Sequence, residues 1–268
     1  LAARATGQLA VAEEKLRRAV RLALRRGDDH SAAEARMTLS FVLLDAGQVR
    51  AALRQSGLAS TVLDGVEGAR LLAQHGLILQ RCGRREAALD AYERALSRLR
   101  LDADLLWQAK VLSNRGILEA YQGSLSAAES DLLQARDLQE RLGRPVDSAM
   151  STWNLGFVAS SRGDAVEALR LFDAATTVLD DRHVGTAERA IDRAEVLLSV
   201  GMSDEALTLA VRALGELLRQ GQRASAMECR LLVARAALIS GDYPLALEQA
   251  RLARRFAGVQ QREAWALV

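Results

Sequence analysis

Proline, cysteine and aromatic residues are scarce in this sequence of 268 residues. It contains 2 Pro, 2 Cys and 4% aromatic residues, although half of its residues are hydrophobic. Strands favour β-branched and aromatic side chains, whereas Ala, Leu, Arg and Glu, which dominate here, favour helix. The composition therefore predicts an all-α protein.

The two cysteines, Cys82 and Cys229, lie far apart and form no CxxC motif. Their spacing argues against a disulfide framework and a structural zinc site, and fits a reducing, cytoplasmic setting. The sequence also lacks an uninterrupted apolar run of about 18 residues. We therefore expect neither a signal peptide nor a transmembrane helix.

An excess of charge of one sign is also missing. The 36 basic and 34 acidic residues are interspersed and leave a formal net charge of +2. This balance argues against a nucleic acid or an anionic membrane as partner. Arginines gather near the ends of two predicted helices, where the helix dipole and nearby glutamates favour a solvated face over an anion site. They are Arg17, Arg18, Arg21, Arg25, Arg26, Arg251, Arg254 and Arg255.

A repeat of about 39 residues is the strongest pattern that the sequence does contain. The segment NRGILEAYQG at 114–123 returns forty residues later as NLGFVASSRG at 154–163. Seven glycines each precede an alanine by five and by twelve residues, and several precede a bulky residue by nine. They are Gly7, Gly47, Gly83, Gly123, Gly163, Gly201 and Gly241. Such a period indicates a repeat architecture.

The spacing within one repeat predicts a helical hairpin. Glycine suits the turn after a helix, because a left-handed residue there lets the chain reverse. The alanines and the bulky residue fall on one face of the next helix, and Gly76, Gly116 and Gly156 place small residues on the preceding helix. We predict second helices at 9–26, 49–63, 85–100, 125–141, 165–180, 203–219 and 243–256, with first helices between them. Hairpins of this kind must stack, which predicts one array over 1–268.

EAALDAYERAL (86–96) and EALRLFDAA (167–175) resemble the tetratricopeptide repeat, in which an aromatic residue stands between two alanines. The period departs from the usual 34 residues of that repeat, and Ser56 and Ala250 are weak where it has a bulky residue. The resemblance implies a right-handed α-solenoid of about seven helical hairpins with helices extended by about a turn. The chain begins at Leu1 and shows no polar cap at either end, so we expect a fragment of a longer chain.

Three segments resemble the repeat region of actinobacterial proteins that carry a C-terminal CHAT domain, a caspase-like cysteine peptidase. They are KVLSNRGILEAYQGSLSAAESDL (110–132), WNLGFVASSRGD (153–164) and DRAEVLLSVGM (192–202). The resemblance implies a non-catalytic scaffold that controls the attached peptidase. The repeat regions of bacterial transcriptional regulators are similar enough that a sensory role in such a regulator is the alternative.

The tetratricopeptide resemblance also implies a binding groove on the concave face, formed by the first helices. Such a groove suits a protein or peptide better than a small molecule. Asn114 and Asn154, nine residues before a turn glycine, stand where members of the family hold a peptide backbone. The alternative is that the aromatic residues of this face only pack. The expected groove residues are Arg81, Lys110, Asn114, Ile117, Tyr121, Met150, Trp153, Asn154 and Phe157.

Catalytic, cofactor and metal sites are weakly supported by comparison. A nucleophile would need Cys82 or Cys229 beside one of the histidines. His75 lies seven residues, about 10 Å, before Cys82 in one helix, which is beyond hydrogen-bond reach. The three histidines, His30, His75 and His183, are scattered, and the Asp180/Asp181 pair suits a solvated turn better than a metal ion. We expect no catalytic residue, cofactor or metal in this chain.

Overall fold

The computed structural model describes the backbone of residues 2–182 and 184–259, and side chains of 8–182, 184–222 and 225–255. Within these residues the chain forms thirteen α-helices and no strand, which confirms the all-α prediction. The helices are α1 (Ala2–Arg25), α2 (Asp29–Asp45), α3 (Val49–Ala59), α4 (Gly65–Arg81), α5 (Arg85–Leu101), α6 (Leu105–Tyr121), α7 (Leu125–Arg141), α8 (Pro145–Ser161), α9 (Ala165–Asp181), α10 (Thr186–Ser199), α11 (Ser203–Gln220), α12 (Arg223–Ile239) and α13 (Tyr243–Val259). None of these helices is both long and apolar enough to cross a membrane.

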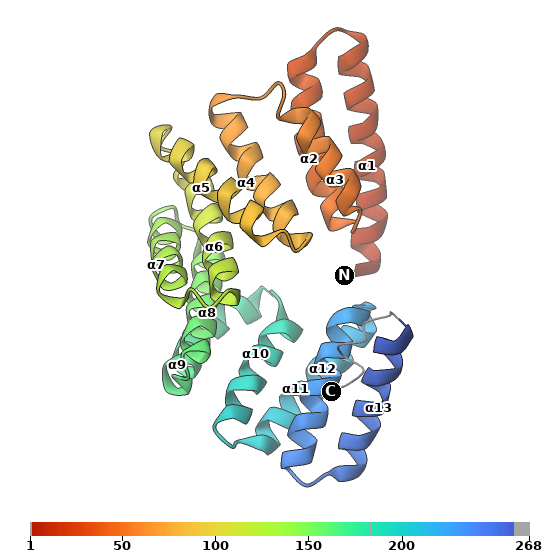
Figure 1. Cartoon of the computed structure of the whole chain (residues 1–268), viewed down its shortest axis with the longest axis vertical. Helices are drawn as coiled ribbons and strands as arrows, with labels where there is room; N and C mark the ends of the chain where they lie inside the picture. The colour runs from red at the N-terminus through yellow and green to blue at the C-terminus, as the bar shows by residue number, and fades with distance from the viewer. Residues whose placement is uncertain (1, 183, 260–268) are drawn as a thin grey trace. The chain divides into compact units, whose positions relative to one another are not determined.

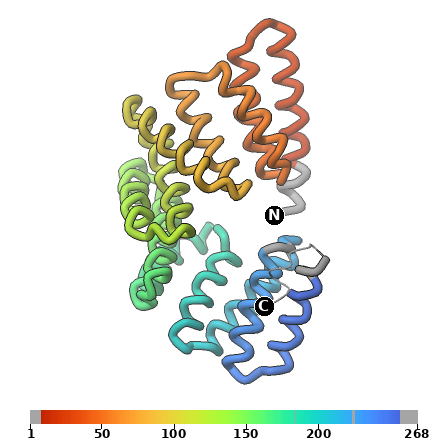
Figure 2. The backbone as a smooth tube through the Cα atoms, viewed as in Figure 1, coloured from red at the N-terminus to blue at the C-terminus, as the bar shows by residue number. Residues whose placement is uncertain are grey.

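The helices pair into hairpins (Figures 1 and 2), and six of the seven repeated glycines lie in the turns between paired helices. Gly83 joins α4 to α5 with a φ of 74°, and Gly123 joins α6 to α7 with a φ of 81°. Both angles lie in the left-handed region that glycine adopts at little cost. The loops between hairpins are also short, the one between α3 and α4 spanning residues 60–64. In the loop before α6, Ala103 takes the left-handed conformation, with a φ of 51°.

Local capping explains where several helices begin. Asp28, Asp104 and Asp164 stand just before α2, α6 and α9, and each accepts a hydrogen bond from a backbone N–H in the first turn. These bonds satisfy donors that a helix leaves unpaired. Pro145 is the first residue of α8, where its missing N–H is not needed.

The predicted small-and-large pattern forms the core of the central hairpins. Tyr92, Leu132 and Phe172 have fully buried side chains, each packed on the glycine of the partner helix. A Cβ atom on Gly156, for example, would lie 2.6 Å from Cε1 of Phe172. The glycine therefore lets the aromatic ring fill the space between the two helices, as the spacing predicts.

The chain divides into two compact units, Leu1–Ser151 and Thr152–Val268, and the boundary falls within α8. In the first unit, each hairpin packs on the previous one through contacts of α4 with α2 and α3 and of α6 with α4 and α5. The second unit repeats this scheme, with α10 against α9 and α12 against α10 and α11. Sequential antiparallel packing of hairpins is thus confirmed in both units, and the single array over 1–268 stays a prediction.

The outermost helices depart from the predicted pattern. Gly7 does not form a turn, because α1 runs without a break from Ala2 to Arg25. Continuing the helix through Gly7 gives the backbone groups of this segment partners within α1. Ala19 and Ala250, expected to pack, are exposed, while Val20 and Gln249 are buried in their place. Arg230 donates a hydrogen bond to Gln249, which accounts for that side chain facing inward.

Candidate protein-binding surfaces

In the first unit, α6 presents four of the expected groove residues along one face. Lys110, Asn114, Ile117 and Tyr121 are spaced by four, three and four residues, so they form one stripe. Lys110 and Tyr121 are exposed, Tyr121 by 63%, whereas Asn114 and Ile117 are partly buried. The Lys110 ammonium lies 4.6 Å from the centroid of the Trp107 ring, a cation–π contact that orients it. We call these four residues the α6 stripe.

The other groove residues of this unit lie on neighbouring first helices. Arg81 is the exposed last residue of α4, and Met150 is partly buried in α8. Helices α4 and α6 are in contact. In the second unit, Asn154 and Phe157 are partly buried in α8. Whether these residues bind a partner stays a prediction.

Trp153 is a packing residue, one of the two alternatives that the sequence left open. Its side chain is only 3% exposed, and its ring stacks on Phe172 with centroids 4.0 Å apart. Its indole Nε1 donates a hydrogen bond of 2.8 Å to Asp192 of α10, and the Arg189 guanidinium lies 5.2 Å from the ring centroid. Trp153 therefore ties three helices of the second unit together.

Polar residues nine positions before a turn glycine also connect first helices. Gln74 of α4 donates from Nε2 to the Met37 carbonyl at 2.8 Å and to the Ser40 hydroxyl at 2.9 Å, both in α2. Asp192 occupies the same place in α10. Asn114 and Asn154 share this position, but the sequence analysis did not include Gln74 and Asp192. Their common distance from the turn glycine is the signal that could have found them.

The environment of Asp192 raises the pKa of its carboxyl group to about 6, chiefly through burial. The Trp153 N–H opposes this shift, because it stabilises the charged form, and Glu195 and Glu188 add to it. Asp192 is thus a carboxyl group with a raised pKa where α8 meets α10.

A charged cluster missed by the sequence analysis lies on another side of α6. Arg115 donates from Nε and Nη2 to both carboxylate oxygens of Asp131 in α7, at 2.6 and 2.8 Å, and from Nη1 to Glu93 in α5. Burial raises the pKa of the nearby Glu119, and Asp131 adds to the shift. The cluster joins three consecutive helices, but its members are too far apart in sequence for the repeat pattern to reveal.

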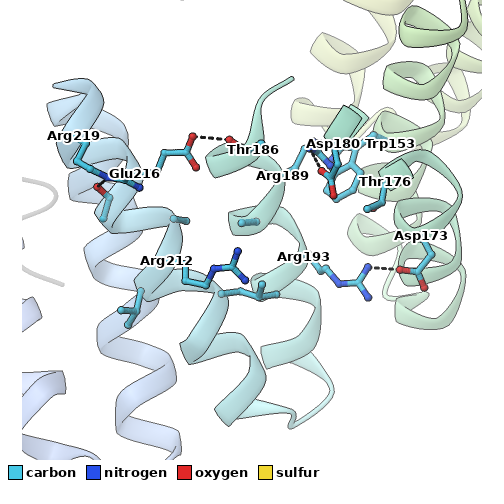
Figure 3. A pocket seen from close by; sticks show the side chains of 15 residues that line it. Trp153, Asp173, Thr176, Asp180, Thr186, Arg189, Arg193, Arg212, Glu216 and Arg219 are labelled. Carbon is cyan, nitrogen blue, oxygen red and sulfur yellow. Dashed lines mark hydrogen bonds and ion pairs between the residues drawn. The ribbon is translucent and has the colours of Figure 1, made fainter. Parts of the chain in front are cut away.

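The second unit holds a pocket of about 820 Å³ lined mainly by α9, α10 and α11 (Figure 3). Asp180 and Asp173 of α9 pair with Arg189 and Arg193 of α10, at 2.5 and 2.7 Å. On the opposite side, Thr186 of α10 donates a 2.6 Å hydrogen bond to Glu216 of α11. These contacts connect α10 to the second helices on either side of it, α9 and α11. The space between α9 and α11 remains open and forms the pocket.

The cysteines and histidines considered as reactive residues do not form a nucleophile–base pair among the described side chains. Cys229 is buried, its thiol donates to the Ala210 carbonyl, and burial raises its pKa to about 11, so it is not a thiolate at neutral pH. His75 lies within 3.0 Å of the Ser56 hydroxyl rather than at Cys82. His183 lies outside the described residues.

His30 lies close to two carboxylates, although the sequence predicts that the histidines are scattered. The ligand atoms of His30, Glu34 and Glu67 lie within 4.8 Å of one another, because α4 packs on α2. His30 and Glu67 are 3.3 Å apart and partly exposed, which describes a surface ion pair. The arginines of α1 and α13 named above are exposed, as expected for a solvated face.

Comparison with known proteins identifies the fold and no family. No protein-family model matches the sequence, and no curated protein matches it significantly. Among solved structures, the chain is similar to a signal-transduction ATPase with a tetratricopeptide repeat sensor from Pyrococcus horikoshii, with a TM-score of 0.66 and 13% identity over 94% of this chain and 42% of that one. The chain thus spans about two fifths of the length of that protein.

Two further similar structures are complexes. One is a Rap protein complexed with competence and sporulation factor, with a TM-score of 0.66 and 13% identity over 89% of this chain and 72% of that one. The other is the APC/C hetero-tetramer Cut9–Hcn1, with a TM-score of 0.71 and 17% identity over 95% of this chain and 44% of the matched one. At these identities the comparisons show a tetratricopeptide-repeat fold.

Proposed function

We propose that this chain is a non-catalytic module that binds a protein or peptide on the face formed by its first helices. The observation that carries the proposal is the α6 stripe, in which Lys110 and Tyr121 are exposed beside the partly buried Asn114 and Ile117. A cation, an aromatic ring, an amide and an apolar side chain on one rigid helix face suit recognition of a peptide. The complexes of the Rap protein and of Cut9 with Hcn1 are examples of this fold bound to another molecule.

The proposal extends to an attached effector that partner binding controls. Its support is the resemblance of 110–132, 153–164 and 192–202 to the repeat region of CHAT-domain proteins, so the effector we propose is a C-terminal cysteine peptidase in the cytoplasm. The ATPase from Pyrococcus horikoshii carries its repeat sensor within a larger protein, which also fits the alternative of a transcriptional regulator. The gene sequence beyond residue 268 discriminates them: a His/Cys peptidase segment supports the first, and a helix-turn-helix the second.

The binding face is tested by site-specific photocrosslinking in the source cell. Benzoylphenylalanine replaces Tyr121 of the α6 stripe and, as a matched control, the exposed Leu133 of the second helix α7. We expect a crosslinked protein specific to position 121. The affinity of that purified protein should then fall at least tenfold with Lys110→Glu/Tyr121→Ser, because both side chains are exposed contacts. An unchanged affinity in the folded variant would rule out the α6 stripe.

A further inference from the structure

The pocket between α9 and α11 carries positive charge beyond what its own carboxylates balance. Its lining contains four arginines against two aspartates and one glutamate. Asp173 forms an ion pair with Arg193, and Asp180 forms one with Arg189. This pairing leaves Arg212 and Arg219, both exposed on α11, with Glu216 as the one remaining acidic residue of the lining.

Glu216 is itself engaged with neutral donors. One carboxylate oxygen, Oε1, accepts hydrogen bonds from the Thr186 hydroxyl at 2.6 Å and from the Gln220 amide at 2.9 Å. In Figure 3, Glu216 turns to Thr186, whereas Arg212 extends from α11 toward the space beside α10. Arg219 donates from Nε to the Gly215 carbonyl of its own helix at 3.2 Å. The terminal N–H groups of Arg219 and those of Arg212 are the donors for an incoming anion.

The spacing of Arg212 and Arg219 indicates the form of that anion. Seven residues are two turns of α11, or about 10 Å along its axis. An extended peptide in the polyproline II conformation repeats every three residues, or about 9 Å, on one side. Two acidic side chains three residues apart in such a peptide can therefore reach one arginine each.

The pocket also offers apolar surface near Arg212 and free space between the two arginines at Gly215. Val211 is 44% exposed, and Leu209 and Ala190 contribute further apolar lining. At Gly215, one turn from each arginine in the lining, a Cβ atom would meet no heavy atom within 4 Å. A side chain between the two acidic residues can enter this space, and the volume of about 820 Å³ falls in the range of ligand pockets.

We propose that this pocket binds an extended acidic segment of a protein partner. Two carboxylates three residues apart contact Arg212 and Arg219, and a residue between them enters the space at Gly215. The inference shares one premise with the proposed function, namely that the chain binds proteins. It uses the second helices α9 and α11 rather than the α6 stripe, so the two can fail separately.

The test is a selection from a random-peptide phage library against the whole chain and against Arg212→Gln/Arg219→Gln. Both arginines are exposed, so the variant should unfold at the same temperature as the parent. We expect the parent, but not the variant, to enrich peptides with Asp or Glu at two positions three apart. Arg50→Gln/Arg54→Gln, the same charge change on the exposed face of α3, is the control and should keep the enrichment.

A synthetic peptide with the enriched sequence then gives the affinity by fluorescence anisotropy. Replacing its two glutamates by glutamine should weaken binding at least tenfold, as should Arg212→Gln/Arg219→Gln, because each change removes charge-assisted hydrogen bonds. Equal enrichment of acidic pairs by parent and variant, or none by either, overturns the proposal. Inorganic phosphate and succinate are titrated as well, and binding of these small anions without acidic peptides overturns the assignment to a protein segment.

The α6 stripe variant separates this result from the proposed function. Peptides that require Lys110 and Tyr121 but not Arg212 and Arg219 would leave the proposed function standing and overturn this inference. Acidic peptides lost only with Arg212→Gln/Arg219→Gln support the pocket independently of the α6 stripe.

Discussion

Gly76 of α4 lies directly against the ring of Tyr92 in α5, so that a Cβ atom on Gly76 would be 2.7 Å from both Cδ1 and Cε1. The Tyr92 side chain is fully buried, and its hydroxyl donates a 2.7 Å hydrogen bond to Gln80 of α4. The ring is thus fixed at both its face and its hydroxyl. In the second unit, Gly156 lies against the ring of Phe172 in the same way.

We expect Gly76→Ala to destabilise the protein by about 2 kcal/mol. The added methyl group overpacks against a ring that cannot move, which outweighs the gain of about 1 kcal/mol in helix propensity. Urea unfolding measures the difference. Gly57→Ala in α3 is the matched control, because a Cβ atom there meets nothing within 4 Å and should stabilise by up to about 1 kcal/mol. Changes in the free energy of unfolding that have the same sign for Gly76→Ala and Gly57→Ala would contradict this prediction.

The repeat spacing alone predicts which residues make such contacts in the central hairpins. Gly76, Tyr92 and the turn glycine Gly83 recur at fixed distances, and each distance follows from helix geometry. Periodicity is informative there because every central hairpin has the same neighbours. It fails at Gly7 and Ala250 because helices α1 and α13, each packed on one side among the described residues, can rotate or extend.

The binding surfaces are less predictable than the hairpins. The α6 stripe follows from the position of its residues in the repeat, but the role of Trp153 depends on its contacts with Phe172 and Asp192. The pocket depends on which carboxylates neutralise which arginines across three helices. Such pairings join residues of different repeats, and no spacing within one repeat encodes them.

Ala103 should gain stability when replaced by glycine. Its φ of 51° costs alanine about 1 kcal/mol, and glycine takes this conformation freely. Subtracting the cost of the greater flexibility of glycine in the unfolded chain, we expect Ala103→Gly to stabilise the protein by up to about 0.5 kcal/mol. Gly143→Ala, at the matching loop one repeat later with a φ of 64°, should destabilise by about 1 kcal/mol. Thermal unfolding compares both variants with the parent.

Asp192 should make the protein less stable as the pH rises from about 4 to 7. Its pKa is about 6 in the folded chain against an ordinary value of 3.8, so the folded state keeps a proton that the unfolded state releases. The stabilisation by the bound proton is complete below about pH 4 and is lost as the pH rises through 6. The free energy of unfolding falls by roughly 2–3 kcal/mol over this range.

Asp192→Asn isolates this contribution, because its amide oxygen can still accept the Trp153 hydrogen bond. Free energies of unfolding measured at pH 4 and pH 7.5 should show the parent losing roughly 2–3 kcal/mol relative to the variant. Parallel pH dependences for the two proteins would show that Asp192 titrates normally.

Trp153→Ala should destabilise the second unit by about 3–5 kcal/mol, the usual cost of emptying a large aromatic site. A loss of binding in that variant would therefore report unfolding rather than recognition. Trp153→Phe retains a ring against Phe172 but removes the hydrogen bond to Asp192 and part of the indole beside Arg189, so we expect a cost of about 1–2 kcal/mol. Near-ultraviolet circular dichroism and urea unfolding of both variants check this order.

Arg115 should be the most costly arginine to remove in the first unit. Its guanidinium makes a two-point contact with Asp131, whose side chain is 6% exposed, and a third contact with Glu93. Arg115→Met leaves Asp131 buried without its cation beside Glu119, so we expect a loss of about 3 kcal/mol. Arg94→Met, which breaks the exposed pair with Asp90, should cost less than about 0.5 kcal/mol. Equally small losses of unfolding free energy for both variants would contradict this prediction and would mean that Asp131 finds another donor. In that case, adding Asp131→Asn to Arg115→Met would restore no stability.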